Sequence, residues 1–185
     1  MAQLGAWPSK RWQGDGQYAA QMVTEGEPAP DFTATTDAGE RVSLSDFRGK
    51  PVVLYFYPKD DTPGCTAQAC GIRDAYAEFE RAGAVVLGIS PDKESKHVKF
   101  KQKYDLPFTL LADPEHEVAD RYGTWGEKRY MGRTYWAVKR TTFIVAPDGT
   151  VAKVMHAVKP ATHAGDVLAV LAAAEPRTPT GLQRS

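Results

Sequence analysis

The stretch Val52-Val53-Leu54-Tyr55-Phe56-Tyr57 is a continuous apolar run that ends at Pro58. Such a run predicts a strand that is buried on both faces. Residues 63–81 follow with apolar side chains at spacings of three and four, which predicts an amphipathic helix. A second apolar run at residues 84–90 predicts another buried strand. Strand, helix and strand with short connections indicate a parallel βαβ unit, and this unit decides the fold.

The remaining segments extend this unit on both sides. Residues 93–104 predict a helix, residues 109–112 a short strand, and residues 164–174 a closing helix with Thr162 as a possible N-cap. Residues 141–145 and 151–154 flank the turn Pro147-Asp148-Gly149 and predict an antiparallel hairpin. Residues 31–35 and 41–44 predict a further hairpin ahead of the βαβ unit. This layout is typical of an α/β, thioredoxin-like fold with an N-terminal β-hairpin extension and a central mixed sheet flanked by helices.

The chain has 185 residues, which suits one domain of the usual size of about 100–200 residues. Glycine and proline are frequent near both ends, which favours irregular structure there. We therefore expect an irregular N-terminal extension at residues 1–22, one thioredoxin-like domain at residues 23–174, and a loose C-terminal tail at residues 175–185.

Charge and hydropathy exclude several classes of protein. Lys and Arg total 23 and Asp and Glu total 23, so no net field attracts nucleic acid or an anionic membrane. The longest apolar run falls far short of the roughly 18 residues of a membrane span, and the N-terminus lacks the apolar stretch of a signal peptide. We therefore expect a cytoplasmic chain. Cysteines in that reducing compartment are more often catalytic, redox-active or metal-binding than structural.

The first of only two cysteines follows the end of the first buried strand, in residues 58–65. Thr62 and Pro63 predict a helix start, with a hydroxyl at the N-cap and a proline ring in the first turn. Cys65 then lies beside unpaired backbone N–H groups and the positive end of the helix dipole, which favour the reactive thiolate. The alternative is that Cys65 is a small buried apolar residue, since it continues the apolar stripe of the helix.

Cys70 follows five residues later. In an intact helix this offset is a rise of about 7.5 Å and a rotation of about 140°, so the two sulfurs would point apart. A bond between Cys65 and Cys70 would therefore require the first turns of the helix to unwind, and Gly71 would favour that because glycine is a poor helix former. The alternative is a pair of unrelated buried cysteines.

Other kinds of site fit the sequence less well. The cysteine spacing is not the C-x-x-C of a thiol–disulfide reductase, and two cysteines alone make a poor zinc site. Histidines at positions 97, 116, 156 and 163 show no ligand spacing with the cysteines, and we interpret them as surface or packing residues. Lysines within residues 93–103 are interpreted as a solvated helix face rather than a nucleic-acid site. A thioredoxin-like binding module with silent cysteines stays an open alternative.

Several separated blocks of the sequence carry a family resemblance. They are Phe56-Tyr57-Pro58-Lys59, Thr62-Pro63-Gly64-Cys65-Thr66, Gln68-Ala69-Cys70, Leu87-Gly88-Ile89-Ser90-Pro91-Asp92, Thr124-Trp125-Gly126-Glu127-Lys128, Met131-Gly132 and Arg140-Thr141-Thr142-Phe143. In this order they resemble the peroxiredoxin family, and within it the peroxiredoxin Q or bacterioferritin-comigratory-protein branch. The resemblance spans residues 25–172 and leaves both ends unexplained.

The resemblance implies a thiol peroxidase that acts on hydrogen peroxide and organic hydroperoxides. Cys65 would be the peroxidatic cysteine, oxidised to a sulfenic acid, and Cys70 the resolving cysteine that forms an intramolecular disulfide with it. Thr62 would hydrogen-bond the peroxide, Pro58 would shield the pocket, and Arg140 would stabilise the thiolate and polarise the O–O bond.

The resemblance also implies how the peroxide is held and which partner completes the cycle. Backbone N–H groups of Gly64 and Cys65 would complete a cradle for the peroxide oxygens. Thioredoxin or a similar dithiol protein would reduce the disulfide, without a cofactor or a metal. This branch is often monomeric, so we expect a monomer.

Overall fold

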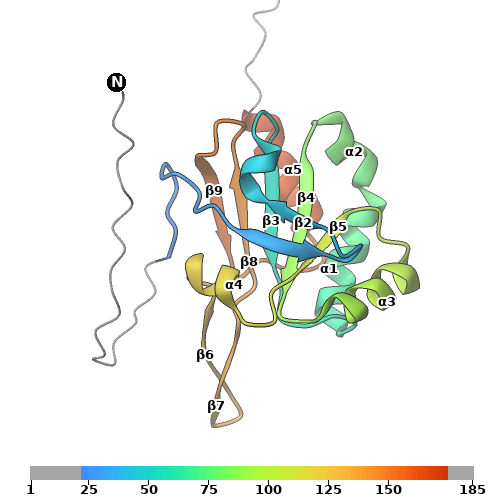
Figure 1. Cartoon of the computed structure of the whole chain (residues 1–185), viewed down its shortest axis with the longest axis vertical. Helices are drawn as coiled ribbons and strands as arrows, with labels where there is room; N and C mark the ends of the chain where they lie inside the picture. The colour runs from blue at the N-terminus through green and yellow to red at the C-terminus, as the bar shows by residue number, and fades with distance from the viewer. Residues whose placement is uncertain (1–21, 175–185) are drawn as a thin grey trace, which may run out of the picture.

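Seven strands form one central sheet in the computed structural model, which describes residues 22–174 (Figure 1). Their order across the sheet is β2-β1-β5-β4-β3-β8-β9. The strands are β1 (Thr33–Thr36), β2 (Arg41–Ser43), β3 (Val52–Phe56), β4 (Val85–Ser90), β5 (Thr109–Ala112), β8 (Thr141–Val145) and β9 (Val151–His156). Because β3 pairs in parallel with β4 and antiparallel with β8, the sheet is mixed, as predicted.

Helices cover both faces of this sheet. They are α1 (Pro63–Asp74), α2 (Tyr76–Arg81), α3 (Glu94–Tyr104), α4 (Glu117–Arg121) and α5 (His163–Ala174), with a 3₁₀ turn, η1, at Leu44–Phe47. One cluster of buried side chains joins the sheet to α1, α2, α3 and α5. A second cluster joins the opposite face to α4 and to residues 23–34. Figure 1 shows α4 in front of the sheet and α5 behind it. The apolar faces predicted from the sequence therefore meet in two cores, one on each side of the sheet.

The central strand β3 explains why the run 52–57 dominates the fold. All its residues are buried, and Leu54 pairs with Leu87 on one side and Phe143 on the other. The N-terminal hairpin is confirmed as well, since β1 pairs with β2 and then joins the sheet through β5. The parallel pair β3–β4 with α1 and α2 between its strands is the predicted βαβ unit.

The single helix predicted at residues 63–81 is wrong in one respect, because the chain turns at Ala75. With φ −100° and ψ 9°, Ala75 ends α1 and precedes α2. Ile72 and Phe79 stay buried on either side of the turn. The apolar stripe that predicted one helix is therefore shared by two.

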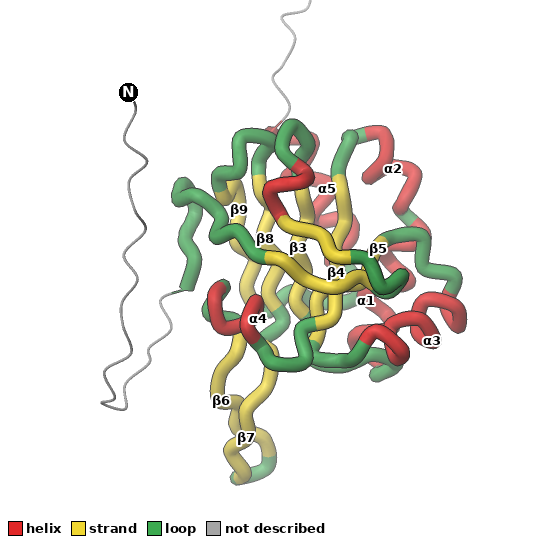
Figure 2. Tube along the Cα trace, in the orientation of Figure 1, coloured by secondary structure: helices red, strands yellow, loops and turns green. Residues whose placement is uncertain are grey.

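The hairpin of β6 (Trp125–Tyr130) and β7 (Arg133–Val138) has no counterpart in the prediction, nor have α4 and η1. Figure 2 shows this hairpin projecting from the body of the molecule. Tyr130 and Trp136 are 67% and 57% exposed, so these strands lack the burial that produces an apolar alternation.

Residues 1–21 of the predicted N-terminal extension (1–22), and the whole predicted tail at residues 175–185, lie outside the described residues. At the start of α5, the carbonyl of Thr162 accepts a hydrogen bond from Asp166 N at 3.0 Å, as an N-cap residue does. Its hydroxyl, however, donates to the Asp166 carboxylate at 2.9 Å. Among residues 22–174, no helix combines the length and the apolar character needed to cross a bilayer.

Candidate active site

The connection from β3 to α1 delivers Cys65 to the first turn of α1. Pro63 occupies the first turn of the helix, as predicted, and Thr66 N donates to the carbonyl of Thr62 at 2.8 Å. The predicted hydroxyl cap is wrong, because the Thr62 hydroxyl donates to the carbonyl of Lys59 at 3.0 Å instead. This bond tightens the loop, and the backbone of Thr62 alone starts the helix.

Arg140 meets Cys65 from the neighbouring strand. The register of β3 with β8 sets Phe56 opposite Thr141, so Arg140 stands at the end of β3 from which the chain runs to Cys65. Its Nη2 donates to Cys65 Sγ at 3.3 Å, and Cys65 is only 1% exposed. A Cβ at Gly64 would lie 3.2 Å from this Nη2, so glycine there leaves room for the guanidinium. The structure therefore brings a cation to a buried sulfur, and the catalytic roles that the resemblance implies for these two residues stay a prediction.

A chain of buried polar side chains extends from Arg140 and was missed by the sequence prediction. Arg140 Nη1 donates to Gln68 Oε1, and Gln68 Nε2 lies 3.2 Å from His163 Nδ1. The second ring nitrogen of His163 lies 2.8 Å from Thr142 Oγ1. Gln68 stands one helical turn after Cys65, which is a signal that spacing alone could have provided. His163 comes from the closing helix, and only the folded chain shows its place in the site.

The electrostatics of this chain of contacts favour an uncharged imidazole. Burial, and secondarily the positive charge of Arg140, lower the pKa of His163 to about 4. His163 is therefore neutral at pH 7. Burial and the charge of Arg140 also lower the pKa of Lys128 within β6, so this part of the strand lies within electrostatic reach of the site.

The other predicted residues, Pro58, Thr62 and Cys70, lie near Cys65 in the chain and make no hydrogen bond to its sulfur. Pro58 is half-buried where β3 leads into the loop, and Thr62 is half-buried at the start of α1. Cys70 is half-buried within α1, and both cysteines are free thiols. The structure thus shows a helical state in which no bond joins Cys65 to Cys70.

A buried carboxylate anchors the loop between β3 and α1. Asp60 accepts a hydrogen bond from the Tyr57 hydroxyl at 2.6 Å and lies 2.7 Å from His97 Nδ1. The other ring nitrogen of His97 lies 3.1 Å from the carbonyl of Leu111 and must donate to it, since a carbonyl only accepts. His97 is a packing residue, as predicted, but its packing fixes the loop that carries Thr62.

The lysines of α3 form a solvated, partly ion-paired face. The ion pairs are Lys96–Asp92, Lys101–Asp37 and Lys103–Asp61, with N–O distances of 3.1, 2.9 and 2.8 Å. Three of the five lysines predicted to form a solvated helix face are therefore paired with carboxylates.

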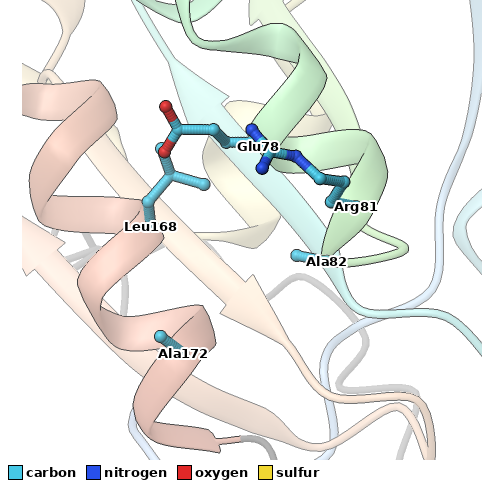
Figure 3. A pocket seen from close by; sticks show the side chains of 5 residues that line it. All are labelled: Glu78, Arg81, Ala82, Leu168 and Ala172. Atoms are coloured by element: carbon cyan, nitrogen blue, oxygen red, sulfur yellow. The ribbon is translucent and has the colours of Figure 1, made fainter.

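A hollow of about 370 Å³ lies between α2 and α5 (Figure 3). Its lining residues are Glu78, Arg81, Ala82, Leu168 and Ala172. It contains neither cysteine and none of the polar side chains around Cys65, so it is separate from the candidate active site.

Several known proteins are similar to this chain in both fold and sequence. Residues 25–154 match the AhpC/TSA family. The peroxiredoxin Bcp of Bacillus subtilis (strain 168) is 45% identical over 146 residues, which cover 79% of this chain and 93% of the relative. The crystal structure of peroxidoxin BcpB from Mycobacterium tuberculosis is 35% identical with a TM-score of 0.75, covering 84% of this chain and all of the other. The bacterioferritin comigratory protein of Xanthomonas campestris is 34% identical with a TM-score of 0.73, covering 77% and 90%.

The chain therefore belongs to the AhpC/TSA family of peroxiredoxins, and the thioredoxin-like fold is confirmed. Within that family its relatives are the Bcp and peroxiredoxin Q proteins, so the branch indicated by the sequence blocks is confirmed as well.

Proposed function

We propose that the chain is a thiol peroxidase in which Cys65 attacks hydrogen peroxide and organic hydroperoxides as a thiolate. The observation that carries this proposal is the 3.3 Å hydrogen bond from Arg140 Nη2 to Cys65 Sγ in the first turn of α1. Arg140 thus sets a fixed positive charge beside this sulfur, and the first turn of a helix is a position in which cysteines act as nucleophiles.

In the first step the Cys65 sulfur attacks one oxygen of the peroxide and the O–O bond breaks. The sulfur is oxidised to a sulfenic acid, and the other oxygen leaves with the bond's electron pair and takes up a proton as water or an alcohol. Arg140 is placed to stabilise the charge that moves onto the leaving oxygen. The Thr62 hydroxyl, which donates to the carbonyl of Lys59, keeps lone pairs that can accept a hydrogen bond from the peroxide, and Pro58 shields the pocket.

In the second step the Cys70 thiol attacks the sulfenic sulfur, water leaves, and a Cys65–Cys70 disulfide forms. Because the two residues are five positions apart in an intact helix, this step follows local unwinding of α1. A dithiol protein such as thioredoxin then supplies two electrons and returns both thiols. The cycle requires sulfur chemistry alone, without a cofactor or a metal.

Organic hydroperoxides belong in the proposal because the structures of the Xanthomonas campestris relative concern its alkyl peroxide reduction activity. A thiol cycle of this kind suits the reducing cytoplasm, where dithiol reductants are available. An intramolecular disulfide needs no second subunit, so we propose a monomer, which size-exclusion chromatography with light scattering would test.

The test compares two matched serine variants in a peroxide-consumption assay with thioredoxin and its reductase. Cys65→Ser is expected to abolish turnover. Cys70→Ser, the same chemical change five residues later, is expected to reduce peroxide once and to retain a sulfenic acid on Cys65 that a dimedone probe traps. Undiminished turnover by Cys65→Ser would contradict the proposed function, and normal thioredoxin-coupled turnover by Cys70→Ser would contradict the intramolecular resolution.

A further inference from the structure

Gln68 joins the catalytic cation to a helix that is distant in sequence. On one side it accepts from Arg140 Nη1, and on the other its amide nitrogen lies 3.2 Å from His163 Nδ1 on α5. Both Gln68 and His163 are completely buried, so bulk solvent does not compete for the hydrogen bond between them. Near the first turn of α1, which carries Cys65, the contact between α1 and α5 is therefore a polar one, whereas the rest of this core is apolar.

The direction of each hydrogen bond follows from what each group can donate. A guanidinium only donates, so the amide oxygen of Gln68 faces Arg140 and its NH₂ faces His163. Nδ1 of His163 must then accept, which requires that the ring proton sits on Nε2. That proton is directed to Thr142 Oγ1 at 2.8 Å. One tautomer of a neutral imidazole satisfies the whole chain of donors.

We propose that His163 is a positioning residue for Cys65. By accepting from the Gln68 amide, it fixes the orientation in which Gln68 receives Arg140, and Arg140 in turn stays at hydrogen-bond distance from Cys65. This inference rests on the proposed function, because it assigns His163 a part in the chemistry proposed for Cys65.

The position of Gln68 gives His163 a second effect on the same cycle. Gln68 lies between Cys65 and Cys70 in α1, so the segment cannot unwind without breaking its bond to His163. The bond that supports the attack on peroxide therefore opposes the disulfide step. Loss of the bond should slow the first step and accelerate the second, each by about fivefold, because a single neutral hydrogen bond is typically worth that factor.

Two substitutions at one position separate this role from a structural one. His163→Leu keeps an apolar body of similar size and removes the acceptor. His163→Asn sets an amide oxygen near the position of Nδ1 and should restore both rates toward wild type. Val167→Ala, a buried α5 residue without a polar contact, is the matched control for loosened packing of α5 and should leave both rates near wild type.

The measurement is stopped-flow fluorescence of the full chain mixed with hydrogen peroxide, in which sulfenic acid formation and disulfide formation are separate phases. Opposite changes in His163→Leu, with recovery in His163→Asn, would support the inference. Unchanged rates, changes of the same sign in both phases, or the same opposite pattern in Val167→Ala would overturn it. Where His163→Leu does not fold, Thr142→Val removes the partner of Nε2 and should shift the two phases in the same opposite directions by a smaller factor. A wild-type chain without an oxidation phase would instead refute the proposed function itself.

Discussion

The rate of disulfide formation should depend on how easily α1 unwinds, and an exposed alanine between the cysteines tests this. Ala67 lies on the solvent side of α1, between Cys65 and Cys70. Ala67→Gly therefore removes no buried contact, and its main effect is the loss of helix propensity, about 1 kcal/mol. The substitution does not alter Arg140, which donates to the Cys65 sulfur, so this contact stays in place while α1 is helical.

A cost of about 1 kcal/mol raises the population of the unwound segment about fivefold. If Cys70 attacks from that state, Ala67→Gly should form the disulfide about five times faster than wild type. Gly71→Ala should have the opposite effect. A Cβ at Gly71 would meet only the carbonyl of Pro160 at 4.0 Å, so the alanine fits and stabilises the helix by a similar amount.

The assay is rapid mixing with hydrogen peroxide, followed by acid quench and mass-spectrometric counting of disulfide against sulfenic acid. Ala77→Gly, an exposed site in α2 outside the segment that unwinds, is the matched control and should leave the disulfide phase unchanged. Equal disulfide rates in Ala67→Gly, Gly71→Ala and wild type would refute the reasoning that local unwinding limits this step.

Three further predictions concern the groups around the sulfur. Arg140→Leu removes a charged hydrogen bond to Cys65 and should slow the reaction with peroxide by about 10- to 100-fold in stopped-flow measurements, whereas an unchanged rate would mean that the contact has no kinetic role. The pKa of His163 is about 4 in the folded chain and about 6.5 when unfolded, so the unfolded state binds more protons as the pH falls below about 6.5. The free energy of unfolding should therefore fall by about 2 kcal/mol between pH 7 and pH 5. Urea titrations should show this loss in wild type and not in His163→Asn. Asp60→Ala leaves the ring of His97 and the hydroxyl of Tyr57 buried without their acceptor and should cost about 2–4 kcal/mol in chemical denaturation; a cost below about 1 kcal/mol would show that the carboxylate does not anchor the loop.

The sequence was sufficient to predict the elements whose buried residues form a continuous or periodic apolar pattern along the chain. The run at 52–57 and its partner at 84–90 became β3 and β4, because strands buried on both faces need continuous apolar residues. The helix start at Pro63 was predictable for a local reason, since proline suits the first turn and leaves Cys65 among unpaired N–H groups. The βαβ unit and the place of Cys65 therefore follow from local physical chemistry.

Long-range polar contacts were beyond such reasoning. Gln68 and His163 are 95 positions apart, and no periodicity signals that two buried polar residues will meet. The Thr62 hydroxyl had two partners within reach, the backbone N–H groups of α1 and the carbonyl of Lys59, and the shape of the loop selected the second. The β6–β7 hairpin was missed because its strands pair with each other and are largely exposed.

In the proposed cycle the Cys65 sulfur is oxidised while α1 is helical, and the sulfenic acid reacts with Cys70 only after α1 unwinds. Hydrogen exchange by mass spectrometry on the Cys70→Ser chain, before and after one equivalent of hydrogen peroxide and against the oxidised wild type, tests it most directly. We predict that backbone amides of residues 65–71 stay protected in the sulfenic acid form and lose protection only in the disulfide form. Equal protection of this segment in the reduced chain and in a mapped Cys65–Cys70 disulfide would contradict it.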